Sequence, residues 1–274
     1  MLADLSTYSL QDFLLFDAAI YRDLFGQLNG DLWPLPLAGI VLALFLLGLR
    51  TKRPALADRG AMVLLAAAFL TSAWFFFFGV YATINFAAVY PGWGFVAEAG
   101  LFVLAAVLLA ATSGVSRELK AASLWSRGLA HLVVLYGLFG HPAAEWATGR
   151  AWANLEWFAL APDPTALAAL GFLALWRSPW RYAVAIVPVV WLAASALTLT
   201  GLTIEMEALC LALATLIGLV ALALPRQRSV GLAPRQRNAA TNIREVRPAA
   251  IGVPRFPGRK AIGGQALLPT TRRQ

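Results

Sequence analysis

The sequence is poor in charged residues, and this scarcity excludes an ordinary soluble domain. Only 13% of the 274 residues are charged, whereas 60% are hydrophobic. A soluble domain carries about 25% charged and roughly 45–50% apolar residues. The apolar excess is too large for a water-soluble core, so lipid must surround much of the chain.

Cysteine, histidine and lysine are also scarce, and each scarcity limits the chemistry. The single cysteine, Cys210, excludes an intramolecular disulfide and any multi-cysteine metal site. His131 and His141 are about 15 Å apart along one helix, so they cannot ligate the same haem iron. None of the three lysines falls in a hydrophobic stretch, which excludes a retinal Schiff base. The phosphate-binding loop, zinc-protease and nucleophile-elbow motifs are missing, so we expect no enzyme, metal or cofactor.

Long hydrophobic stretches are what the sequence does contain. A helix needs about 20 mostly apolar residues to cross a bilayer. Seven stretches qualify: 32–50, 60–84, 94–114, 122–140, 164–180, 182–202 and 205–225. They predict an all-α fold, a polytopic membrane helix bundle of about seven transmembrane helices over residues 32–225. Residues 1–31 form an N-terminal segment, and residues 226–274 a basic, disordered tail.

The placement of basic residues predicts the orientation of the bundle. Of the 22 Lys and Arg residues, 20 fall in alternate loops or in the tail, leaving Arg22 and Arg150 on the other side. Because basic loops stay in the cytoplasm, the N-terminus is expected outside and the C-terminus in the cytoplasm. Tryptophans gather near both predicted boundaries, as in an interfacial belt. Trp74 and Trp191 fall in mid-span and are expected to be packing residues.

Two segments are expected to lie on the membrane surface. Residues 9–28 have the pattern of an amphipathic interfacial helix, which Ser9 can cap. Asp17 falls within its apolar arc: either the helix is slightly rotated, or the carboxylate is directed at the bundle. The basic tail can bind anionic lipid headgroups, but it can also serve only to reinforce the orientation.

Acidic residues open the helices that run inward from the outer side. The acids near the predicted helix starts, where the helix dipole favours a carboxylate, are Asp31, Glu98, Asp163, and Glu205 together with Glu207. Asp163 followed by proline is typical of an N-cap. The alternative is that these acids converge on an outward-facing cation or proton site, with Glu145 and Glu156 contributing. Glu98 is the preferred candidate in such a site, and Asn85 is a neutral ligand.

Two further patterns concern helix packing. Pro188 is expected to bend the sixth hydrophobic stretch, because proline removes a helix hydrogen bond. Cys210, Ala214 and Gly218 form a stripe of small residues on the seventh stretch, suited to close helix contact.

Several short motifs, in order, resemble those of an uncharacterised bacterial family of multi-pass membrane proteins that is sometimes labelled permease-like. The motifs are Leu28-Asn29-Gly30-Asp31-Leu32-Trp33-Pro34, Thr83-Ile84-Asn85, Tyr136-Gly137-Leu138-Phe139-Gly140-His141-Pro142, Ala161-Pro162-Asp163-Pro164-Thr165 and Val187-Pro188-Val189-Val190-Trp191. The resemblance covers about residues 8–225 and implies a membrane fold in the bacterial inner membrane. It implies no activity, and cysteine replaces the aspartate at the position of Asp163 in some members.

Two functions remain open from the sequence. One is a small permease-like transporter with an acidic cation or proton site in its outer half. The other is a structural or accessory subunit of a larger membrane complex, favoured by abundant Ala, Trp and Phe and by few buried polar groups. The expected partners are the lipid bilayer and, for an accessory role, other membrane subunits. Nucleic acid is not expected as a partner, because the basic excess is confined to the tail.

Overall fold

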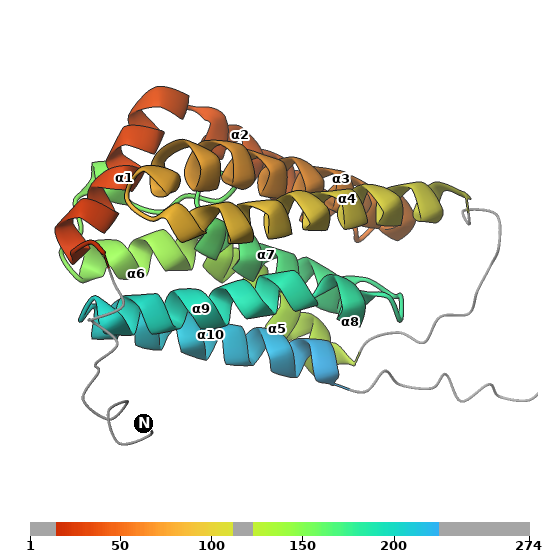
Figure 1. The fold of residues 1–274 in the computed structure, drawn as a ribbon. Helices are drawn as coiled ribbons and strands as arrows, with labels where there is room; N and C mark the ends of the chain where they lie inside the picture. The colour runs from red at the N-terminus through yellow and green to blue at the C-terminus, as the bar shows by residue number, and fades with distance from the viewer. Residues whose placement is uncertain (1–14, 112–122, 225–274) are drawn as a thin grey trace, which may run out of the picture. The chain divides into compact units, whose positions relative to one another are not determined.

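The computed structural model describes residues 15–111 and 123–224, which form helices and no strand (Figure 1). This confirms the all-α class for the described ranges. The α-helices are α1 (Ala18–Leu32), α2 (Leu35–Leu49), α3 (Pro54–Thr71), α4 (Val89–Ala111), α5 (Leu124–Leu135), α6 (His141–Ala147), α7 (Pro162–Leu175), α8 (Arg181–Val184), α9 (Ile186–Gly201) and α10 (Glu205–Ala223). Two π-helical segments, η3 (Ser72–Val80) and η6 (Tyr136–Gly140), and three 3-10 turns, η4 (Tyr81–Thr83), η5 (Phe86–Ala88) and η7 (Trp152–Asn154), complete the set.

Four helical segments are long and apolar enough to cross a membrane. They are Pro54–Thr83, Phe86–Ala111, Arg181–Gly201 and Glu205–Ala223. A fifth crossing is possible if α1 and α2, which meet at an 83° bend, act as one span. Helix α7 has only 14 residues and measures about 21 Å at 1.5 Å per residue. Seven crossings therefore remain a prediction.

Helix α7 lies at the centre of the bundle. All of its residues are buried, and it contacts α3, α5, α9 and α10. Glycines permit the closest of these approaches. A Cβ atom added to Gly171 would lie 2.7 Å from the backbone nitrogen of Val134, and one added to Gly137 would lie 2.7 Å from the carbonyl oxygen of Pro164. The helix backbones therefore touch where these glycines lie.

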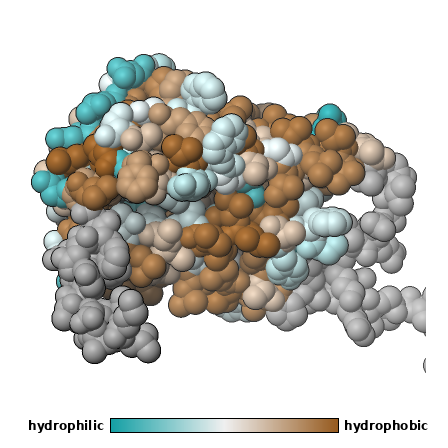
Figure 2. Space-filling view, in the orientation of Figure 1, coloured by the Kyte–Doolittle hydropathy of each residue, from teal (hydrophilic) through white to brown (hydrophobic). Residues whose placement is uncertain are grey.

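The outer surface of the bundle is largely hydrophobic. Figure 2 shows hydrophobic residues over most of the drawn face and hydrophilic residues gathered at the end that carries α1. Exposed apolar side chains occur on α2, α4 and α10, including Phe45, Val107 and Leu216. Soluble monomers rarely expose continuous apolar patches of this kind. The surface is suited to contact with lipid.

Hydrogen bonds between elements show which helix ends lie together. Arg50, at the end of α2, donates to the carbonyl oxygen of Leu175, at the end of α7. Away from this contact, Arg22 of α1 pairs with Glu207 at the start of α10 at 2.9 Å. Asn29 of α1 donates to the carbonyl oxygens of Ala153 and Leu155, both at 2.8 Å. The start of α10 and the segment before α7 therefore meet at α1.

Several sequence expectations need correction at the helix ends. A continuous helix over 9–28 is wrong, because residues 15–17 are not helical and Asp17 caps α1. Ser9, the second basic loop and the tail lie outside the described residues. Trp74 is not a packing residue, since its side chain is 64% exposed. The α-helix is interrupted at Ala185, three residues before Pro188, where a bend is predicted. Proline has no backbone N–H, so the carbonyl group four residues before it, next to Ala185, loses its helix hydrogen bond.

Candidate functional site

A cluster of charged side chains is buried where α6, α7 and α10 begin (Figure 1). Each of its residues is at most 3% exposed, although such residues are almost never fully buried unless paired. We call this set the polar cluster: His141, Glu145, Arg150, Glu156, Asp163 and Glu207.

The local structure around α6 brings the first three members together. The π-helical segment η6 ends at Gly140, and His141 opens α6 directly after it. Glu145 follows one helical turn later, on the same face. The chain then reverses at Gly149, whose φ of +90° suits a residue without a side chain. The backbone nitrogen of Arg150 closes the turn on the carbonyl oxygen of Glu145 at 3.1 Å.

Arg150 is the centre of the ion pairs. Its Nη1 pairs with Glu145, with Glu156 at 3.2 Å and with Glu207 at 3.4 Å. Its guanidinium carbon also lies 4.8 Å from the centre of the Phe25 ring, a cation–π contact. The second oxygen of Glu145 accepts the backbone N–H of Glu156 at 2.7 Å, which fixes the extended segment before α7.

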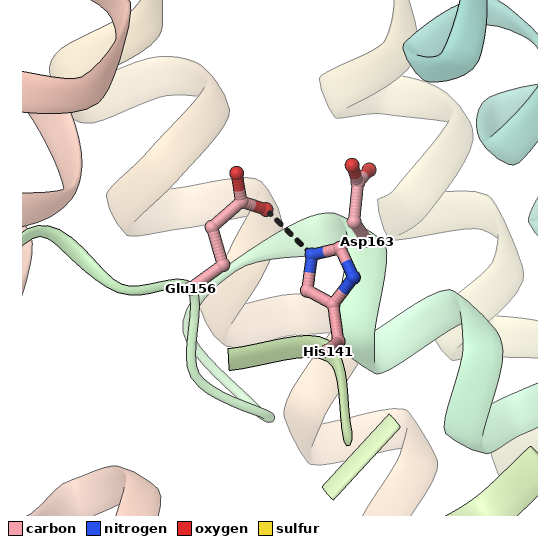
Figure 3. Close-up of side chains that lie close together, drawn as sticks. All are labelled: His141, Glu156 and Asp163. Atoms are coloured by element: carbon pink, nitrogen blue, oxygen red, sulfur yellow. Dashed lines mark ion pairs between the residues drawn. The ribbon is translucent and has the colours of Figure 1, made fainter. Parts of the chain in front are cut away.

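Three side chains of the polar cluster lie close together (Figure 3). His141, Glu156 and Asp163 each place a ligand atom within 4.8 Å of the other two. His141 Nε2 lies 3.7 Å from an oxygen of Glu156, too far for a hydrogen bond.

Asp163 is held in position by α9. Its Oδ1 accepts the indole N–H of Trp191 at 2.7 Å, and its Oδ2 accepts the hydroxyl of Ser195 at 2.6 Å. Trp191 is fixed in turn by edge contacts with the rings of Phe77 and Phe95. The expected packing role of Trp191 is therefore confirmed. Its indole also donates a hydrogen bond to Asp163 in the polar cluster.

The polar cluster and its partner Arg22 hold more negative than positive charge. Four carboxylates face two guanidinium groups, so two negative charges remain when His141 is neutral. Uncompensated charge is costly in a low-dielectric interior. A site of this composition can take up protons or a cation.

The pKa values of the groups near α6 follow from this imbalance. Burial opposes the charged imidazole, but Glu145 and Glu156 outweigh it and raise the pKa of His141 to about 9. Burial, together with the charge of Glu156, raises the pKa of Glu145 to about 8. Burial would also raise the pKa of Glu156, but the hydrogen bonds and charges of His141 and Arg150 outweigh it, so the pKa of that carboxyl is lowered.

The structure brings together only part of the predicted site. Asp163 belongs to the polar cluster, but as the second residue of α7, with Ala161 at the N-cap position. Glu98 is fully buried in the middle of α4, because that helix begins at Val89 and not near residue 94.

The other three predicted residues lie outside the polar cluster. Glu205 is exposed at the first position of α10. Asn85 caps η5 and donates to the hydroxyl of Tyr81 at 3.1 Å. Asp17 is exposed and accepts the backbone N–H of Ile20 at 2.8 Å.

Sequence reasoning gave too little weight to Arg150, Glu207 and His141. Arg150 was placed with the outer loops only as a topology marker, yet it is the single arginine between α6 and α7 and stands between two glutamates in sequence. That spacing was the available signal. No sequence signal separates Glu207 from Glu205, because both lie in the first turn of α10.

Comparison with known proteins gives a family and no function. No curated protein and no solved structure matches the chain. One family model matches residues 18–233, which include every described helix and the whole polar cluster. The chain belongs to the family of unknown function DUF6064.

Proposed function

We propose that this chain is a permease-like protein of the bacterial inner membrane whose polar cluster binds protons or a cation during transport. In this proposal the chain crosses the bilayer seven times, with the N-terminus outside and the basic tail in the cytoplasm. The polar cluster then lies in the outer half of the bilayer, where the inward-running helices α7 and α10 begin.

The observation that carries the proposal is the buried charge imbalance. Ionisable groups inside membrane proteins are rare and typically mark ion or proton pathways. Here three buried carboxylates pair with one buried arginine, the carboxylate of Asp163 lies near one of them, and Arg22 stands at the edge. Protons on His141 and Glu145, whose pKa values are raised to about 9 and about 8, offset this excess of carboxylates, so the polar cluster can take up and release protons near neutral pH.

A flux measurement on the full chain in liposomes tests this function. With a pH-sensitive dye inside, gradients of Na⁺, K⁺, Mg²⁺, Mn²⁺ and Zn²⁺ are imposed in turn. We expect at least one gradient to move the ion or protons across the membrane. Glu156→Gln, which keeps the size of the side chain but removes a charge, should abolish this movement.

The matched control is Asp31→Asn, which removes an exposed acid from α1. It should retain the flux of the unmodified chain. Absence of flux for every ion, or equal flux in Glu156→Gln, would contradict the proposal.

A second candidate, an accessory subunit, is favoured by a groove between α3 and α4. The groove has a volume of about 470 Å³ and is lined mainly by Val, Ala and Leu side chains, with Arg59 at one end. Such a groove suits a helix of another membrane subunit. Extraction in a mild detergent should then yield an assembly with other chains, whereas a lone monomer would contradict this role.

A further inference from the structure

We infer that His141, Glu156 and Asp163 bind one divalent transition-metal ion of the Zn²⁺ or Mn²⁺ type. The inference rests on the cation site proposed above and names its occupant. It is argued from buried ligand atoms that lack a hydrogen bond, from the geometry, and from the charge.

Two ligand atoms are buried and face each other without a hydrogen bond. Among the described residues, none hydrogen-bonds to His141 Nε2 or to Glu156 Oε2. Both residues are at least 97% buried, so water does not replace the missing partner from bulk solvent. Buried polar atoms of this kind are uncommon and call for an explanation such as an ion.

The spacing fits a metal ion better than a hydrogen bond. Nitrogen and oxygen ligands bind Zn²⁺ at about 2.0–2.2 Å, so at the tetrahedral angle two ligand atoms of one ion lie roughly 3.3–3.6 Å apart. The separation of His141 Nε2 and Glu156 Oε2 is 3.7 Å. Asp163 offers a carboxylate oxygen within 4.8 Å of both ligand atoms, and its hydrogen bonds to Trp191 and Ser195 hold it there.

The surroundings of the three ligands also resemble a metal site. Carboxylate ligands are usually oriented by hydrogen bonds from neighbouring groups. Asp163 receives such bonds from Trp191 and Ser195, and the carboxylate of Glu156 receives one from Arg150. Each carboxylate oxygen has lone pairs left for an ion.

The charge and the ligand types indicate the class of ion. Metal binding displaces protons from its ligands, and the two negative charges that remain around a neutral His141 equal the charge of one dication. One imidazole with two carboxylates suits Zn²⁺, Mn²⁺ or Fe²⁺, whereas Mg²⁺ and Ca²⁺ prefer oxygen ligands alone. Three protein ligands leave a position open for water or for release of the ion.

Metal binding to the full chain in detergent tests the inference. The protein is purified with an affinity tag that contains no histidine, treated with EDTA and dialysed. Zn²⁺, Mn²⁺ and Ca²⁺ are then titrated separately, with bound metal measured by elemental analysis and affinity by calorimetry. We expect one Zn²⁺ or Mn²⁺ per chain, a higher melting temperature with that metal, and no binding of Ca²⁺.

The two histidines provide a matched pair of variants. His141→Gln should abolish stoichiometric binding. His131→Gln should leave it intact, because His131 bonds only its own helix, at the carbonyl oxygen of Arg127. Ser195→Ala keeps all three ligands but removes one hydrogen bond to Asp163, and should weaken binding about 10–100-fold.

Three results would overturn the inference: no metal bound to the unmodified chain, equal binding by His141→Gln, or loss of binding in His131→Gln. If His141→Gln does not fold, the unmodified chain and Ser195→Ala decide the question. Failure of metal binding with proton flux retained refutes only the metal, and the proposed transport survives. Stoichiometric binding without flux refutes transport and leaves the metal site.

Discussion

Glu98 is the one buried carboxylate in the described part of the chain whose two oxygens both lack a hydrogen-bond partner. It is fully buried on α4 and lies outside the polar cluster. A buried polar group without a partner costs about 1–3 kcal/mol. We therefore expect Glu98→Leu to raise the free energy of unfolding by about 1 kcal/mol, measured by denaturation in detergent. A loss of more than about 1 kcal/mol would show that Glu98 has a favourable partner.

Glu205 and Glu207 differ sharply in surroundings although they are two residues apart. Glu207 is buried and bonded to Arg22, Thr148 and Arg150, whereas Glu205 is exposed. Removing one partner of a buried ion pair costs about 3–5 kcal/mol. Glu207→Ala should therefore destabilise the protein by several kcal/mol, and Glu205→Ala by less than about 0.5 kcal/mol. Equal effects in thermal unfolding would refute the buried network.

At the residue scale the sequence could predict that acids gather at helix starts, but not which of them are buried together. Asp163 does lie in the first turn of α7, which the adjacent proline indicates in the sequence. Glu98 was misplaced, because the helical segment that carries it begins at Phe86, after the cap Asn85, and not near residue 94. The partners of Arg150 come from three separate segments, and no local pattern links them.

The contact between α5 and α7 depends on glycine. A methyl group added at Gly171 would lie 2.8 Å from the carbonyl oxygen of Ala130, an atom that cannot move aside cheaply. Gly171→Ala should destabilise the protein by about 1–3 kcal/mol, the usual cost of overpacking. Thermal unfolding in detergent measures this change.

Gly128 is the control, because no described atom lies within 4 Å of a Cβ added there. Gly128→Ala should stabilise the protein by roughly 0.5–1 kcal/mol, as alanine restricts the unfolded chain. An equal loss in both variants would mean that α5 and α7 are not in backbone contact.

At the element scale, the helices could be predicted and their contacts could not. The hydrophobic stretches predict the positions of most helices, because each stretch is bounded by polar or proline-containing segments. The small-residue stripe was seen on α10, where Gly218 does approach Leu170 of α7. The sequence does not single out Gly137 and Gly171 as contact positions, because small residues are common throughout α5–α7 and no stripe of them stands out from its neighbours.

Labelling of single cysteines tests the orientation of the whole molecule. The background is Cys210→Ala, which removes the only thiol. Ala151→Cys and Lys52→Cys then place one thiol at exposed positions in segments predicted to be outside and inside, respectively. In intact cells a membrane-impermeant thiol reagent should label the first variant only, and both after permeabilisation. Labelling of the second variant in intact cells would overturn the proposed topology.

At the scale of the whole molecule, composition predicts an all-α membrane protein, but hydropathy cannot count its crossings. Beyond Asp163 and Thr165 in its first turn, helix α7 is apolar on all sides, and it is only 14 residues long. An apolar helix enclosed by other helices need not match the bilayer thickness, and its hydropathy is the same as that of a lipid-facing helix. The number of crossings therefore depends on tertiary contacts that the sequence does not reveal.

The enclosure of α7 has a consequence for biosynthesis. One of the neighbours that surround it, α10, is also the last described helix to leave the ribosome. Until then, the flank of α7 that meets α10 must face lipid or the insertion machinery. In the proposed topology the bundle therefore closes around its centre only at the end of translation, and chains interrupted before residue 205 would leave that centre open to degradation.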